Sequence, residues 1–315
     1  MTGPIAPPWV DDLFPFATPP ALRVLIDVAW QHAYDTLLET EVYDRTLVES
    51  HCDFMFDLVA APRPYNGWEQ YPPPDEDDRR LPVPLYATPE FVPFGALGTG
   101  AYVGWLVPAP ELGRTDHPVA LASGHEHGVT FIGPDTRSGL EFMLSWALRR
   151  LRQHDAPPTT RRELVGRLAE ELHVRPDPDR VYPGSSWHGS GVTRDDEFEI
   201  VFDVPQGWRN EPGYDGIGVL APAAAFDVGE PFAPGDEPSL AETLAAARRA
   251  LAAGHPATAL LVLMDAFVTS PTCHFAELKP LWARAYRDLG RAAYAERLDR
   301  MAADYPNSCA CPAPH

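Results

Sequence analysis

The chain has 315 residues, of which 45% are hydrophobic and 10% aromatic, so it can bury a core without disulfides or metals. Its 45 acidic and 25 basic residues give a formal net charge of −20, and such a charge repels a phosphate backbone. Composition and charge therefore exclude wholesale disorder and argue against nucleic-acid binding.

Two helices are predicted near the N-terminus, where apolar residues recur at helical spacing over 21–41 and over 46–60. His51 lies on the apolar stripe of the second helix, which favours a packed core histidine over a functional one. Residues 61–93 are rich in proline and predict a long loop or a set of short extended pieces. This loop contains an acidic run that reads as a solvated surface, with a docking patch as the alternative. The run consists of Asp75, Glu76, Asp77 and Asp78.

The most regular stretch of the chain follows, over 94–152. Short apolar runs predict three strands, over 102–107, 119–122 and 129–132. Ser138 and Glu141 have the spacing of a capping box and predict a helix after these strands. Thr160 and Glu163 have the same spacing and predict the start of another helix.

The region before the C-terminal helices is predicted to contain loops and strands. Residues 174–195 read as loop, alternating apolar residues over 198–204 predict a half-buried strand, and 216–221 predict one more. Residues 228–238 hold three prolines and read as a linker. The sequence thus predicts an α+β domain over 1–235, with a mixed or antiparallel sheet and packed helices, and an all-α region over 236–315.

Two helical hairpins are predicted in the all-α region. Ser239 and Glu242 cap a first helix that ends at Gly254. The other helices are predicted over 257–268, 278–289 and 292–304. We expect five residues to lie inside the hairpins: Ala259, Leu263, Ala266, Tyr286 and Ala295.

Small and aromatic residues repeat between the two hairpins with an offset of 36 residues, as from Gly254 to Gly290. The matching residues of the first hairpin are Gly254, Ala259, Leu263, Ala266 and Pro271, and those of the second are Ala283, Tyr286, Gly290, Ala295 and Ala302. This pattern resembles tetratricopeptide repeats, whose period is about 34 residues. Asp299 departs from the pattern, which has a large apolar residue there. Two hairpins of this kind either brace the rest of the protein or bind a partner.

A second resemblance covers residues 90–150, where an apolar segment, a glycine-containing turn, an aromatic strand and a "PV" strand lead to a helix. The residues that carry it are Phe94, Gly98, Gly100, Tyr102, Gly104, Pro118, Val119 and Leu140. The pattern resembles the second half of the SUKH superfamily, which contains fungal cell-wall-synthesis regulators and bacterial toxin-immunity proteins. The usual N-terminal part of that family is not evident beyond Tyr65-Asn66-Gly67. The resemblance implies an α+β domain that binds a protein, often a toxin.

The evidence in the sequence for a catalytic or metal-binding site is weaker than that for these two resemblances. The motifs GxSxG, HExxH, Walker A and GxGxxG are absent. Histidines flank Glu126 at 125 and 127, which reads as a surface turn rather than a metal pair. Ser and His between 185 and 191 lack a diagnostic spacing, and Cys309, Cys311 and His315 lie in a proline-rich tail. We therefore expect no catalytic residue, no metal and no cofactor.

Taken together, these features predict a non-enzymatic protein-binding module of the toxin-immunity type. The first 148 residues hold 21 acidic residues and seven arginines, which favours a basic protein partner. We expect a cytoplasmic location with reduced thiols, because the N-terminus lacks the features of a signal peptide and no apolar run approaches a membrane-spanning length. The alternative is an uncharacterised, hydrolase-like enzyme with a site between the two domains.

Overall fold

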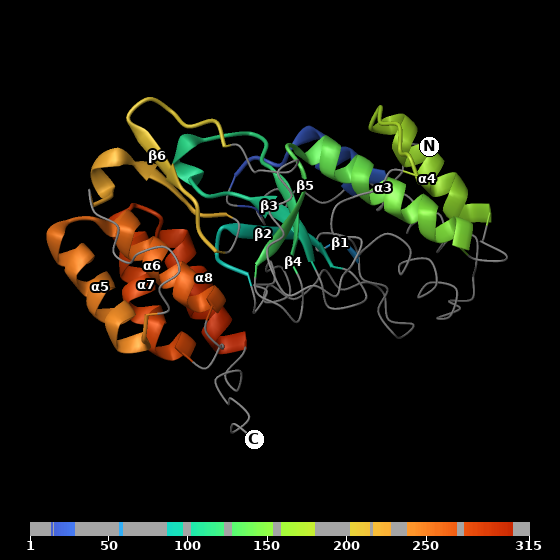
Figure 1. The fold of residues 1–315 in the computed structure, drawn as a ribbon. Coiled ribbons are helices and arrows are strands. Elements are labelled where there is room, and N and C mark those ends of the chain that lie inside the picture. Colours follow the sequence, from blue (N-terminus) through green and yellow to red (C-terminus); the bar gives the residue numbers. More distant parts are fainter. Residues whose placement is uncertain are drawn as a thin grey trace, which may run out of the picture.

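The computed structural model combines an antiparallel sheet with helices and confirms the predicted α+β class. The residues that it describes are 14, 16–28, 57–58, 87–96, 102–122, 128–153, 159–179, 202–214, 217–227, 238–269 and 274–304. Figure 1 shows the sheet in the middle, with helices α3 and α4 on one side and helices α5 to α8 on the other.

Five antiparallel strands form the central sheet, and their order in space is their order in the chain. They are β1 (Asp57–Leu58), β2 (Phe91–Ala96), β3 (Tyr102–Leu106), β4 (Val119–Ala122) and β5 (Val129–Gly133). The three strands predicted between 102 and 132 are confirmed, and β2 adds a fourth next to them. Strands β2 to β5 each pair with the next one along the chain, so this part of the sheet is a meander.

Strand β1 corrects the helix predicted over 46–60. Asp57 and Leu58 pair with Ala96 and Gly95 of β2, because the edge of β2 offers backbone hydrogen-bonding groups that outweigh the local helical pattern. The other residues of that predicted helix, His51 included, lie outside the described residues.

The sheet is buried on both faces, and alternate residues of its strands belong to different cores. Val92, Phe94, Val103, Trp105, Val119 and Leu121 belong to the core on the α3 side. Phe91, Leu106, Ala120 and Ala122 belong to a core on the opposite side. This alternation is the period of two that a pleated strand imposes.

Helices cover the first face of the sheet. Residues 20–28 are helical, within the helix predicted over 21–41, and pack there with α3 (Thr136–Gln153) and α4 (Thr159–Glu171). A Cβ on Gly139 of α3 would lie 2.5 Å from Cβ of Val119, so a glycine lets this helix approach the sheet closely.

The N-cap of α3 lies three residues before the predicted one. The helix begins at Thr136, and Asp135 caps it, because its Oδ1 accepts the backbone N–H of Ser138 at 2.7 Å. The capping box predicted from Ser138 and Glu141 is therefore wrong, since Ser138 already lies in the first turn. The helix predicted from Thr160 is present, but it begins at Thr159. The capping box predicted from Thr160 and Glu163 is therefore also wrong, since Thr160 already lies in the first turn.

A two-stranded hairpin, β6 (Trp208–Glu211) and β7 (Val219–Pro222), lies between the sheet and the C-terminal helices. Leu220 of β7 packs in the core of the second sheet face, whereas Val219 and Ala221 pack in the core of the C-terminal helices. The predicted strand over 216–221 thus corresponds to β7, and this strand links the two cores.

The strand predicted over 198–204 is wrong at the residues that the structure describes. Residues 202–205 form no ladder, and Val204, expected inside, is 40% exposed. Pro205 has no N–H for a ladder, and its carbonyl accepts the N–H of Trp208 at 3.0 Å as the chain turns. Strand β6 follows this turn, and its sequence WRNE has no apolar alternation that could have predicted it.

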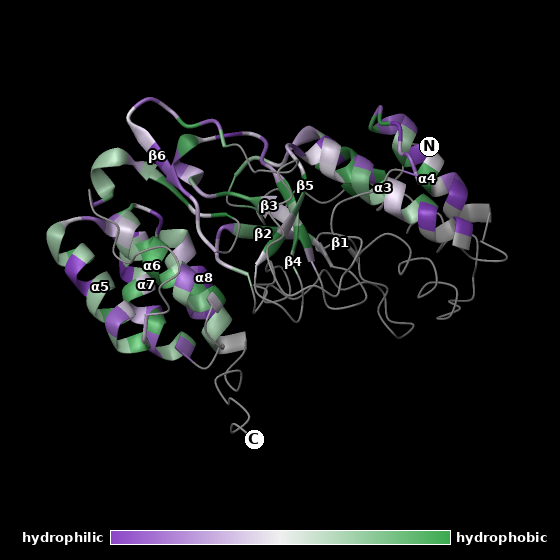
Figure 2. Ribbon diagram, in the orientation of Figure 1, coloured by the Kyte–Doolittle hydropathy of each residue, from purple (hydrophilic) through white to green (hydrophobic). Residues whose placement is uncertain are grey.

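The four predicted C-terminal helices are confirmed as α5 (Leu240–Ala253), α6 (Pro256–Thr269), α7 (Phe275–Asp288) and α8 (Ala292–Asp304). The capping box of Ser239 and Glu242 is present at the start of α5, and Gly254 ends that helix with a φ of +84°. Figure 2 shows hydrophobic and hydrophilic turns alternating along these helices. The boundary predicted near residue 235 lies outside the described residues.

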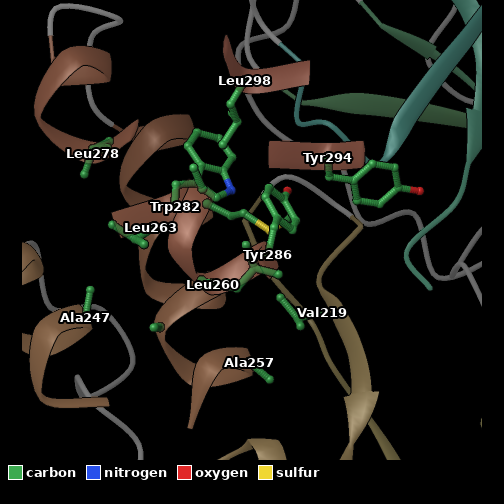
Figure 3. Packing of buried hydrophobic residues seen from close by; sticks show 14 of the residues in the cluster. Val219, Ala247, Ala257, Leu260, Leu263, Leu278, Trp282, Tyr286, Tyr294 and Leu298 are labelled. Carbon is green, nitrogen blue, oxygen red and sulfur yellow. The ribbon is translucent and has the colours of Figure 1, made fainter. Parts of the chain in front are cut away.

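Aromatic residues lie at the centre of the core between these helices (Figure 3). Trp282, Tyr286 and Tyr294 are fully buried, and the rings of Trp282 and Tyr286 stack at 6.4 Å between centroids. Of the five residues expected inside the hairpins, Ala259, Leu263, Tyr286 and Ala295 are buried, whereas Ala266 is only half-buried. Asp299, the departure from the repeat pattern, binds Lys279 of α7 at 2.8 Å on the surface.

Candidate functional site

Six of the residues that carry the SUKH resemblance are described: five belong to the sheet and its connections, and the sixth, Leu140 of α3, is buried against it. Phe94 and Val119 are buried in the core on the α3 side, and Tyr102 packs against the core of the other face. The carbonyl of Pro118 accepts a backbone hydrogen bond from the end of β3 at 2.8 Å. A Cβ on Gly104 would lie 2.5 Å from a carbonyl oxygen of β2, so a glycine is required there. These residues determine the fold and do not converge on a surface site.

The other residues singled out from the sequence cannot be placed in a site. The acidic run of Asp75, Glu76, Asp77 and Asp78, the turn residues Gly98 and Gly100, and the residues of the catalytic and metal-binding motifs considered above all lie outside the described residues. Among the residues that are described, no three His, Cys, Asp or Glu side chains group as metal ligands. Within the same ranges, no helix has the length and apolar character needed to cross a bilayer.

A polar group that was not predicted from the sequence lies where α7 and α8 contact the sheet. We call it the seam, and it consists of Glu90, Tyr286, Tyr294 and Arg297. The hydroxyl of Tyr286 donates to Oε1 of Glu90 at 2.8 Å. The hydroxyl of Tyr294 donates to the backbone carbonyl that follows β3, and Nη2 of Arg297 donates to the first carbonyl of β2 at 2.8 Å. The helices are thereby bonded directly to the ends of two neighbouring strands.

Burial sets the protonation states of the seam. Burial raises the pKa of Tyr286 well above its usual value, and the neighbouring Glu90 raises it further. Burial also raises the pKa of Tyr294, again with a contribution from Glu90. Burial lowers the pKa of Arg297 to about 10, so this side chain still carries its charge at neutral pH. The tyrosines are therefore neutral hydrogen-bond donors near pH 7.

The seam joins the two parts of the fold and leaves no room for a substrate within itself. Glu90, Arg297 and both tyrosines are at most 3% exposed, and packed aromatic rings surround them. Buried polar groups of this kind stabilise a structure only when they are hydrogen-bonded, and these bonds form only when α7 and α8 are in place. The arrangement therefore positions the helices against the sheet.

An ion pair extends the contact between the helices and the sheet. Arg291 precedes α8 and donates to both carboxylate oxygens of Glu111, with Nη2 2.7 Å from Oε1. The same Nη2 donates to the carbonyl of Leu220 in β7. The side chain of Arg291 is 1% exposed and that of Glu111 is 33% exposed. The carboxylate is thus the member of the pair that solvent can reach.

A second buried polar group, around Asp116, lies at the same strand ends but on the α3 side of the sheet. Its Oδ1 accepts the backbone N–H groups of His117 at 2.8 Å and Thr136 at 3.1 Å, and also the hydroxyl of Thr136. Nε1 of Trp105 donates to that hydroxyl oxygen at 2.8 Å. Asp116 therefore joins the loop before β4 to the first turn of α3.

His117 is buried in this group, and its ring centroid lies 4.5 Å from that of Phe16. Burial lowers the pKa of His117 to about 4, although the neighbouring Asp116 acts in the opposite direction. The imidazole is therefore neutral at pH 7 and acts as an aromatic core residue.

One open groove of about 380 Å³ lies beside the seam, among the residues that the structure describes. Its lining comes from the β6–β7 hairpin and the turn after it, from Glu111, from the C-terminal ends of α5 and α7, and from the N-terminal end of α6. The lining residues are Glu111, Trp208, Pro222, Ala224, Ala225, Gly254, Pro256, Asp288 and Leu289. No local pattern in the sequence could have predicted this groove, because its walls come from segments that are far apart in the chain.

The seam, in contrast, had a weak signal in the sequence. Arg297 follows Tyr294 by three residues and precedes Met301 by four, so it occupies an inward position of α8. A charged residue on the apolar stripe of an amphipathic helix needs a buried polar partner. The partner itself could not be found, because Arg297 and the carbonyl that it binds are 206 residues apart.

Comparison with known proteins found no match: no protein-family model fits the chain, and no curated protein has a similar sequence.

Proposed function

We propose that the protein is a non-enzymatic protein-binding module of the SUKH type, which binds a basic protein partner in the cytoplasm as a toxin-immunity protein does. The observation that carries the proposal is the order of β2, β3, β4, β5 and α3, because the SUKH resemblance implies an aromatic strand, a "PV" strand and a further apolar strand before a helix. The chain's net charge of −20 supports a basic partner.

In this proposal the C-terminal helices brace the binding domain. The seam bonds α7 and α8 to the strand ends, and β7 shares its side chains between the two cores. A helical region that served only as a separate binding module would not need buried polar contacts with the sheet. These contacts fill the space at the seam itself, so the open groove lined by both parts of the chain is where the enzyme alternative would place its site.

The proposal is tested by capturing partners from native lysate and then measuring association with the purified partner. The test variant reverses the acidic run by the substitutions Asp75→Arg, Glu76→Arg, Asp77→Arg and Asp78→Arg. The control makes the same change in net charge elsewhere, at exposed positions of α4 and α8. It carries Glu163→Arg, Glu170→Arg, Glu171→Arg and Glu296→Arg.

We expect the association rate to fall as salt rises, because exposed charges are screened beyond about 8 Å at physiological ionic strength. Reversal of the acidic run should lower this rate more than the control does, since local charge at the rim of an interface steers the encounter. Turnover of a substrate in a hydrolase screen, with no protein partner captured, would replace this proposal with the enzyme alternative.

A further inference from the structure

The groove beside the seam has the chemistry of a site for a positively charged side chain. Two carboxylates line it, Glu111 from the loop after β3 and Asp288 from the last turn of α7. The α5 helix also ends there, at Gly254. The C-terminal ends of α5 and α7 carry partial negative charge, whereas Pro256, the first residue of α6, brings the partial positive charge of a helix N-terminus to the same lining. The two carboxylates are therefore what favours a cation in this groove.

Both carboxylates already have a basic neighbour, and in each case the geometry leaves the carboxylate accessible. Glu111 is bound on its buried side by Arg291, whose side chain is 1% exposed, whereas the Glu111 side chain is 33% exposed. Asp288 lies 3.4 Å from Arg284, and its side chain is 43% exposed. A carboxylate has about four acceptor positions, so each can accept a further hydrogen bond from solvent or from a ligand.

Trp208 of β6 supplies an aromatic wall for the same groove. The indole ring is half-buried, so it is held in place and still reachable. Tryptophan is the aromatic side chain that attracts cations best, and arginine also stacks on such rings. A volume of about 380 Å³ lies at the small end of the range for ligand sites, about 300 to 1,000 Å³, and suits one or two side chains better than a folded domain.

We propose that this groove binds an arginine side chain of the basic partner, with the guanidinium against Trp208 and bonded to Glu111 and Asp288. The inference rests on the proposed function, because that function supplies the basic protein. It gives the partner a contact with residues that are separate in the sequence from the acidic run.

The experiment is a titration of the full-length protein with an arginine-rich peptide. The binding is monitored by NMR, through the ¹⁵N–¹H resonances of the tryptophan indole groups. The chain has eight tryptophans, and the Trp208→Phe variant identifies the resonance of Trp208. The matching citrulline peptide is the control, since it has the same shape without the charge. We expect a saturable shift of the Trp208 resonance with the arginine peptide, and a much smaller one with the citrulline peptide.

The Asp288→Asn variant tests the carboxylate, and Glu171→Gln on α4 is its matched control at an exposed position. Asp288→Asn should weaken peptide binding about two- to fivefold, as expected for loss of one exposed ion pair, and Glu171→Gln should leave it unchanged. The proposal is overturned if Trp208 shows no saturable shift, if the citrulline peptide acts equally well, or if Asp288→Asn binds like the wild type.

This titration separates the groove from the proposed function. If a basic partner is captured and binds Asp288→Asn and Trp208→Phe variants with unchanged affinity, the groove proposal fails and the proposed function stands. If the peptide binds as expected but no basic partner exists in the lysate, the groove is a cation site and the proposed function fails.

Discussion

Acidification should destabilise the protein through His117. The buried imidazole has a pKa of about 4, against 6.5 in an unfolded chain. Below pH 6.5 the unfolded chain therefore binds a proton that the folded protein does not, and the free energy of unfolding falls as the pH falls. Each pH unit in this window contributes about 1.4 kcal/mol, so the His117 contribution between pH 7.5 and pH 5 amounts to about 2 kcal/mol.

The assay is urea denaturation of the wild type and of His117→Gln at pH 7.5 and pH 5. The variant removes the titrating group, while the other ten histidines and the carboxylates contribute equally to both proteins. The wild type should lose about 2 kcal/mol more than the variant on acidification. Equal losses in the two proteins would show that His117 titrates normally in the folded state, and the argument from its burial would then be wrong.

Two further substitutions test the close contacts of the sheet. Gly104→Ala places a Cβ 2.5 Å from a carbonyl oxygen of β2 and should lower the free energy of unfolding by about 1–3 kcal/mol, as measured by urea denaturation. The control is Gly166→Ala in α4, where a Cβ meets no atom within 4 Å and the substitution should be neutral or stabilising. Equal effects of the two substitutions would contradict the requirement for glycine at 104. Tyr294→Phe removes the donor to a buried carbonyl and should cost about 1–3 kcal/mol, measured in the same way; an unchanged unfolding midpoint would mean that the seam does not hold α8.

The elements that sequence reasoning found are those with a strong local pattern. The apolar runs at 102–107, 119–122 and 129–132 became strands because each one packs on both faces, and Ser239 with Glu242 formed its capping box because this pairing is local. The elements that were missed depend on distant partners. Strand β1 exists because β2 offers an edge, and β6 exists because β7 pairs with it.

The candidate site was less predictable than the fold for the same reason. Glu90 and Tyr286 are 196 residues apart, and neither belongs to a motif that names the other. The only local signal that could have pointed to the seam is the spacing of Arg297 from Tyr294 and Met301, which places a charged residue on the inward stripe of an amphipathic helix. The groove has even less local signal, because Glu111, Trp208 and Asp288 come from three separate segments.

A cut in the chain near Gly235, between the β6–β7 hairpin and the C-terminal helices, should separate two parts that depend on each other for stability. Residues 1–235 alone would leave the helix-facing side of β7 uncovered, where Val219 and Ala221 are now at most 1% exposed. Residues 236–315 alone would lose the strand ends that Tyr294 and Arg297 bind.

Because each fragment then exposes apolar surface and loses its buried hydrogen bonds, we expect residues 1–235 to aggregate alone. The two fragments should form a stable complex when they are coexpressed, which size-exclusion chromatography can detect. The control is the full-length protein cleaved near Gly235 after folding, so that both fragments remain together. Its melting temperature should stay much closer to that of the uncleaved protein than the melting temperature of either isolated fragment does. A monomeric fragment 1–235 that melts at the temperature of the full chain would contradict the argument, since the helices could then not be bracing the sheet.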